Sequence, residues 1–107
     1  MNYEQRNRFE KKAVEIAERL GRKAGEEAVA EDGCDRVGLM GRYERSHFGI
    51  ADFEDEFVAR LAISFDRVGA AQRTRDEIER SCWSAWVLAR NARVQELCPR
   101  AREYGSD

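Results

Sequence analysis

The chain has little of what interrupts helices or binds metal ions. Its 107 residues include one proline and one histidine, and none of its three cysteines has a C-x-x-C partner. Because proline occurs only at position 99, long helices are permitted through most of the sequence. The missing ligand spacing excludes the common zinc motifs, so we expect neither a structural metal site nor any other cofactor.

Long apolar runs are missing as well. The longest, Ala85 to Ala89, is far shorter than the ~20 residues that cross a bilayer. The first residues, MNYEQRNRF, lack the apolar core of a signal peptide. Three cysteines form no dense disulfide framework, so reduced thiols are expected. These features predict a soluble, cytoplasmic protein without membrane contact.

The sequence also lacks an excess of positive charge. Its 19 basic and 21 acidic residues give a net charge of −2, which argues against direct nucleic-acid binding. The charges are unevenly spread along the chain. Acids concentrate between residues 26 and 56, and arginines between residues 73 and 102. The densest acidic stretch could engage a basic surface on a partner; it contains Asp52, Glu54, Asp55 and Glu56.

What the sequence does contain is helical periodicity, strongest between residues 74 and 98. Thr74 and Glu77 match a capping box, and Pro99 predicts the end of the helix. The apolar side chains form two stripes, so this helix should contact two neighbours. One stripe contains Ile78, Cys82, Ala85, Ala89 and Ala92, and the other contains Trp83, Val87, Val94 and Cys98.

The stripe that begins at Trp83 allows two interpretations. It could pack inside a small helical bundle, or it could form a docking surface for a partner or a second copy of the chain. Tryptophan and arginine dominate the energetics of many interfaces, and two arginines lie beside this stripe. The residues of the docking interpretation are Trp83, Val87, Arg90, Arg93 and Val94.

Two more helices are predicted, over about residues 4–30 and 53–68. Every fourth residue of the first is small, which lets another backbone approach closely, although its glycines could also break it. This row contains Ala13, Ala17, Gly21 and Gly25. The second carries the expected centre of the core and could be capped by Asp52. Its apolar face contains Phe53, Phe57, Val58, Leu61, Phe65 and Val68.

The remaining segments are less regular. EDGCD at 31–35 predicts a turn, a short helix is predicted near 37–47, and the tail from about residue 100 should be frayed. We therefore expect one all-α domain over residues 1–107, a small bundle of three main helices.

This fold and composition favour a non-enzymatic binding or regulatory protein that docks on another protein, with homodimerisation as one form. A specific instance is a compact inhibitor that occludes a nucleic-acid-handling complex, as counter-defence proteins of mobile elements do. The docking surfaces would be the Trp83 stripe and the acidic stretch around Asp52 to Glu56.

Two alternatives belong to other classes. A helix-turn-helix regulator would use the helices at 53–68 and 74–98, but the second begins with acids that repel phosphate. A small metal-dependent hydrolase would need paired acids. Glu15-x-x-Glu18 and Asp52-x-x-Asp55 superficially resemble the metal-binding acids of all-α nucleotide pyrophosphohydrolases, although the second pair departs from their E-x-x-D pattern.

A cysteine hydrolase has even less support in the sequence. Cys34 and His47 are the only Cys–His pair that could meet, and no third group orients them. Cys82 and Cys98 lie roughly 24 Å apart along one predicted helix, so they can share neither an ion nor a disulfide.

Overall fold

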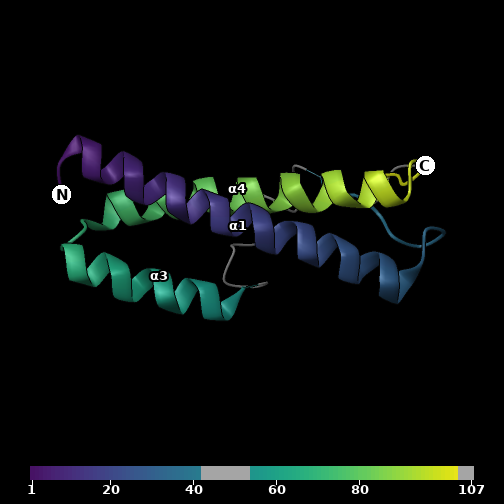
Figure 1. Ribbon diagram of the computed structural model, residues 1–107, viewed down its shortest axis with the longest axis horizontal. Helices are drawn as coiled ribbons and strands as arrows, with labels where there is room; N and C mark the ends of the chain where they lie inside the picture. Colours follow the sequence, from purple (N-terminus) through teal and green to yellow (C-terminus); the bar gives the residue numbers. More distant parts are fainter. Residues whose placement is uncertain (42–53, 104–107) are drawn as a thin grey trace.

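The computed structural model describes residues 1–41 and 54–103, and within them the chain forms three helices (Figure 1). These are α1 (Tyr3–Asp32), α3 (Asp55–Val68) and α4 (Gln72–Leu97). The described residues form no sheet, and their one isolated β-bridge joins Leu39 to Glu103. The predicted all-α bundle of three main helices is thus confirmed.

The two long helices run in the same direction (Figure 1). Arg6 pairs with Glu77 near both N-terminal ends, and Glu26 pairs with Arg93 near both C-terminal ends. Helix α3 runs back along the N-terminal half of this pair and reaches α4 through the three-residue connector 69–71. The C-terminal half of the pair therefore receives no cover from α3.

Helix α1 continues without a break through Gly21 and Gly25. The missing side chains of these glycines let the backbones of α1 and α4 approach closely. A Cβ on Gly21 would clash with the backbone of Trp86, and one on Gly25 would lie 2.7 Å from the carbonyl oxygen of Arg90. All four residues of the small-residue row are buried, which confirms the predicted close approach. Gly33 then ends the helix with φ of 75°, a left-handed value that suits glycine.

Helix α3 supplies the aromatic core, as its periodicity predicts. Phe57, Leu61 and Phe65 are buried against α1 and α4, and the ring of Phe65 stacks on Phe9 with centroids 5.1 Å apart. Phe53 lies outside the described residues. Burial of each such side chain contributes about 2–3 kcal/mol, so this cluster is the main apolar support of the N-terminal half.

The predicted capping box at the start of α4 is wrong. The helix begins at Gln72, two residues earlier, and its N-cap residue Ala71 makes no side-chain hydrogen bond. Thr74 therefore lies inside the helix, while Glu77 accepts hydrogen bonds from Arg6 and Arg73. The cap of α3 also differs, since Glu54 is its N-cap and Asp52 lies outside the described residues.

We call residues 33–41 the strap. They are not helical, so the short helix predicted near 37–47 is wrong for residues 37–41. The strap runs along α4: Arg90 donates to the Gly38 carbonyl (3.0 Å), and Asn91 exchanges two hydrogen bonds with the Met40 backbone (2.9 and 2.8 Å). Residues 42–47 of the predicted helix lie outside the described part. Gly38 and Gly41 already disfavour a helix here, and the hydrogen bonds to α4 replace those that a helix would form.

The C-terminal tail is also more ordered than predicted, at least to residue 103. The N–H of Leu39 donates to the Arg102 carbonyl at 2.8 Å, and Ala101 packs against the apolar cluster of Val37, Val94 and Cys98. The frayed tail predicted from about residue 100 is therefore wrong for residues 100–103. Residues 104–107 lie outside the described part.

The expected reduced thiols are contradicted at two of the three cysteines. Cys34, just after α1, forms a disulfide with Cys98, just after α4, and their Cα atoms lie 5.3 Å apart. The parallel run of α1 and α4 brings these ends together, a pairing that the positions of the cysteines along the chain did not predict. Among the helices of the described residues, none is both long and apolar enough to cross a membrane.

Candidate docking surfaces

The structure places most of the Trp83 stripe inside the molecule. Trp83, Val87 and Val94 are all buried within the single chain, so internal packing is the interpretation that the structure supports. Trp83 stacks on Trp86 with ring centroids 5.6 Å apart. In this conformation, therefore, the stripe offers no exposed surface to a partner.

The two arginines beside the stripe have internal roles as well. Arg90 is only 6% exposed, and its guanidinium donates to the Gly38 carbonyl and to the Asn91 side chain. Arg93 pairs with Glu26 and Glu96, both at 2.9 Å, and the hydrogen bonds that it donates to Glu96 and then to Glu26 raise its pKa. Because Arg90 is buried and hydrogen-bonded and Arg93 is ion-paired within the chain, neither residue forms part of a free basic surface.

The acidic stretch divides into one internal and two exposed side chains. Glu54 accepts a hydrogen bond of 2.9 Å from the indole N–H of Trp86, so it anchors the start of α3 to α4. Asp55 and Glu56 are exposed in the first turn of α3, where Glu56 pairs with Arg60 at 2.8 Å. Asp52 lies outside the described residues. Within the described residues, the exposed acids of the predicted acidic surface are therefore Asp55 and Glu56.

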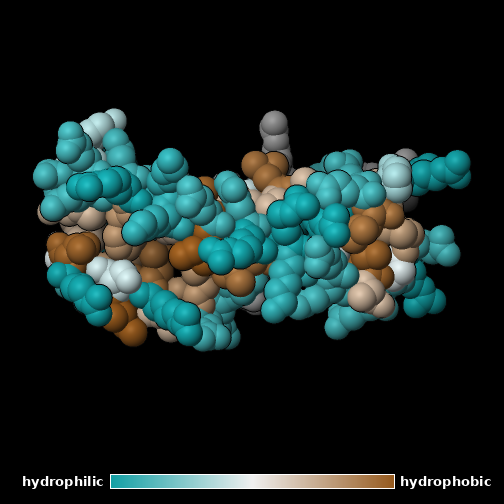
Figure 2. All heavy atoms as spheres, in the orientation of Figure 1, coloured by the Kyte–Doolittle hydropathy of each residue, from teal (hydrophilic) through white to brown (hydrophobic). Residues whose placement is uncertain are grey.

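A cleft of about 290 Å³ lies beside these acids, between α1 and α3. Ile16 and Leu20 of α1, with Phe57 and Leu61 of α3, form its apolar walls. Its polar rim comes from α3 and contains Glu54, Glu56, Arg60 and Ser64. Figure 2 shows apolar groups between the polar side chains that cover this face of the molecule. The cleft can hold an apolar side chain beside a rim of two acids and one arginine, of which Glu56 and Arg60 pair with each other.

Ile16 and Leu20 share a helix face with the small-residue row, where periodicity predicts burial but no cleft. Ile16 is 40% exposed because α3 begins only at residue 55 and lies at an offset from α1. The signal available in the sequence was the run of bulky apolar residues next to small ones on one helix face. The position of α3 against that face could not be obtained from periodicity.

A second, open groove of about 750 Å³ lies between α1 and α4, away from α3. Val14, Ala85 and Ala89 line it, and Leu88 projects into it with more than half of its surface exposed. The charges on its walls have both signs, contributed by Glu18, Arg22 and Arg80. The groove has no dominant charge and so suggests no partner chemistry.

The arrangement gives little support to the hydrolase alternative. No group of three or more metal-ligating side chains occurs within residues 1–41 and 54–103. Cys34 is held in the disulfide and is not a free nucleophile, and its suggested partner His47 lies outside the described residues. Burial raises the pKa of the remaining thiol, Cys82, to about 12, with further contributions from Glu10 and Glu79. A thiol with that pKa is a poor nucleophile near neutral pH.

The geometry also disfavours the helix-turn-helix alternative. In that motif the two helices cross at about 90–120°, whereas α3 runs back along α4 as an αα-hairpin (Figure 1). Of the four arginines that would contact phosphate, Arg90 is buried and Arg93 is paired twice, whereas Arg100 and Arg102 are exposed. Comparison with protein-family models, curated proteins and solved structures finds no match to this chain.

Proposed function

We propose that this chain is a small, non-enzymatic binding protein that docks on another protein through the cleft between α1 and α3. The observation that carries the proposal is the pairing of an apolar cleft with the acids Glu54 and Glu56 at its rim, beside the exposed Asp55. The Trp83 stripe is not part of the proposed surface, because it is buried.

The chemistry of the cleft defines the partner. Its apolar walls and its volume of about 290 Å³ suit one large apolar side chain. Burial of a leucine or phenylalanine there would contribute about 1.5–3 kcal/mol, because its apolar surface leaves water. The acids at the rim favour arginine or lysine residues next to that anchor, because complementary charges speed encounter and set register. The partner is therefore a protein with an apolar anchor inside a basic surface.

Basic surfaces of this kind are common on proteins that bind nucleic acids. A compact acidic ligand on such a surface would compete with nucleic acid for the same positive charges. We therefore propose inhibition by occlusion of a nucleic-acid-handling complex as the specific form of the docking function.

The test is affinity capture from a lysate, with a matched pair of exposed isoleucines. Ile16→Asp places a charge in the cleft wall, and Ile63→Asp places the same charge on a 60% exposed residue of α3 that does not line the cleft. The proposal predicts that one stoichiometric protein is captured by wild type and by Ile63→Asp and is lost with Ile16→Asp. Circular dichroism checks that both variants keep the helical content of wild type.

Charge supplies a second arm of the same test. Reversal of Asp55 and Glu56 to lysine should weaken capture, and the wild-type interaction should weaken as ionic strength rises, because exposed charges are screened. The captured protein should present a basic surface and lose nucleic acid when this chain is added. Capture that survives Ile16→Asp, or capture of nuclease-sensitive material alone, would refute docking at this cleft.

A further inference from the structure

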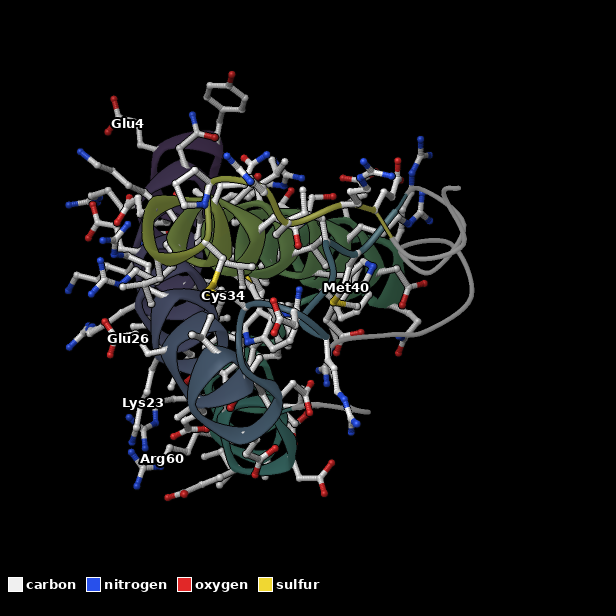
Figure 3. The ribbon with its side chains drawn as sticks, turned by 90° about the vertical axis from the view of Figure 1, so that its right-hand side faces the viewer. Glu4, Lys23, Glu26, Cys34, Met40 and Arg60 are labelled. Atoms are coloured by element: carbon white, nitrogen blue, oxygen red, sulfur yellow. A yellow bond between two sulfur atoms is a disulfide. The ribbon has the colours of Figure 1, made fainter. Side chains whose placement is uncertain are left out.

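The Cys34–Cys98 disulfide closes the end of the molecule that α3 does not cover. Figure 3 views the molecule from this end and shows Cys34 beside α4, with Met40 on the opposite side from Glu26 and Lys23. The strap thus begins at the disulfide and crosses to the far side of the helix pair. The disulfide is the covalent anchor at its start.

The strap covers a surface that would otherwise be open. Its Val37 packs with Val94 and Cys98 in an apolar cluster separate from the aromatic core. Its Gly38 carbonyl accepts from the buried Arg90 guanidinium. The strap thus helps to cover Arg90, Val94 and Cys98, together with Ala28 and Val29 of α1, whereas residues 92 and 95–97 are exposed.

The two sulfur atoms differ in accessibility. Cys34 is exposed, whereas Cys98 is only 3% exposed beneath the strap. An external thiolate can therefore reach the Cys34 sulfur first. The third cysteine does not compete, because Cys82 is fully buried in the aromatic half of the molecule and its pKa is about 12.

We propose that Cys34–Cys98 is a redox-modification site that holds the strap closed, and that a cellular dithiol opens it. One thiolate of the dithiol attacks the Cys34 sulfur, a mixed disulfide forms, and Cys98 leaves as a thiolate that takes a proton from water. The second thiol of the reductant then displaces Cys34. Two electrons pass from the dithiol, which becomes a disulfide, to the protein, which gains two thiols.

Opening has a defined structural consequence. The strap loses its covalent anchor and keeps its noncovalent contacts, which include the hydrogen bonds of Gly38, Leu39 and Met40 and the packing of Val37. The disulfide lies outside the aromatic cluster, which includes Met40 of the strap, and the helices of that half should stay folded on reduction. The reduced chain therefore exposes the Val94 and Cys98 end of α4. This inference does not depend on docking at the cleft, which lies between α1 and α3.

The experiment uses the wild-type chain purified without reductant, then incubated with or without a dithiol and labelled with iodoacetamide. Mass spectrometry before reduction should find Cys34 linked to Cys98 and Cys82 free. After reduction, Cys98 should react about tenfold or more faster than Cys82, which serves as the buried thiol of the same molecule. Hydrogen exchange at the Leu39 and Met40 amides should accelerate in parallel.

Three results would overturn the proposal. Purified protein with three free thiols would show that the disulfide does not form. Slow labelling of both Cys98 and Cys82 after reduction would show that the strap stays closed without it. Fast labelling of both would show that the whole chain unfolds, so that the disulfide is a general staple and not the control of a strap.

Discussion

The two halves of the α1–α4 pair are stabilised by different means. In the half under α3, buried aromatic and aliphatic side chains pack across three helices, and Phe65 and Trp86 lie at the centre. In the other half, a smaller apolar cluster is covered by the irregular strap, by hydrogen bonds from Arg90 and Asn91, and by one disulfide.

This difference shows what a small chain does when it has too few apolar residues for one continuous core. The aromatic half gains stability from area removed from water, which requires no particular bond. The strap side buries less and relies on directional contacts and a covalent link, as small domains often do. The first half should resist a change of redox state, and the second should respond to it.

The largest expected effect comes from creating a cavity in the aromatic half. Phe65 is 1% exposed and stacks on Phe9, so Phe65→Ala leaves a cavity at the centre of the three helices. We expect unfolding free energy to fall by about 3–5 kcal/mol. Urea denaturation followed by circular dichroism measures it. Ile63→Ala, an exposed position on the same helix, is the control and should change stability by less than about 0.5 kcal/mol.

Loss of the disulfide should come next. Its cysteines are 64 positions apart in the sequence. In the chain-entropy model, closing a loop of that size stabilises the fold by about 4 kcal/mol, and the stabilisation measured for disulfides is typically about 2–4 kcal/mol. Cys34→Ser removes the link at the exposed cysteine and should lower the urea midpoint of the non-reduced chain. The same variant and wild type should have similar midpoints in excess dithiol. Similar midpoints without dithiol would contradict the covalent role.

The smallest effect concerns one acid in each half. Hydrogen bonds from Arg22 and then Arg93 lower the pKa of Glu96 below 4.5, so its ionised form favours folding above that pH. This contribution disappears as the pH falls through the lowered pKa. Burial chiefly raises the pKa of Glu79, helped by Asp76 and opposed by Arg75, so its ionisation disfavours folding as the pH rises above 4.5.

Glutamine substitutions separate these two opposite contributions. Glu96→Gln should lower the melting temperature slightly at pH 7 and much less at pH 3, whereas Glu79→Gln should raise it slightly at pH 7. Thermal melts across this pH range at low and high salt measure both changes. Salt should diminish the Glu96 effect, because this ion pair is exposed. Equal shifts at both pH values would contradict the assigned pKa directions.

The sequence predicted the aromatic half well because that half depends on periodicity. The spacing of Phe57, Leu61 and Phe65 and the small-residue row of α1 both specify which faces are buried. The two apolar stripes of α4 likewise indicated two neighbours. Periodicity could not decide whether Trp83 faces the core or a partner, since both environments select the same residue types.

The other half was predicted poorly for a physical reason. Its contacts join segments far apart in sequence, such as Cys34 with Cys98 and Leu39 with Arg102, and no local pattern encodes them. Only the parallel direction of α1 and α4 brings the two cysteines together. The same limit applies to the candidate cleft, since the charge pattern predicted an acidic surface at Asp55 and Glu56 but not the cleft that Glu56 and Ile16 line together.

The most direct test of the distinction between the halves is near-ultraviolet circular dichroism, because the stacked Trp83 and Trp86 report on the aromatic half. The reduced wild type and Cys34→Ser should retain the tryptophan signal of the oxidised chain, while Phe65→Ala should diminish it under the same conditions. Collapse of the signal on reduction alone would contradict the account, because the aromatic half would then depend on the disulfide.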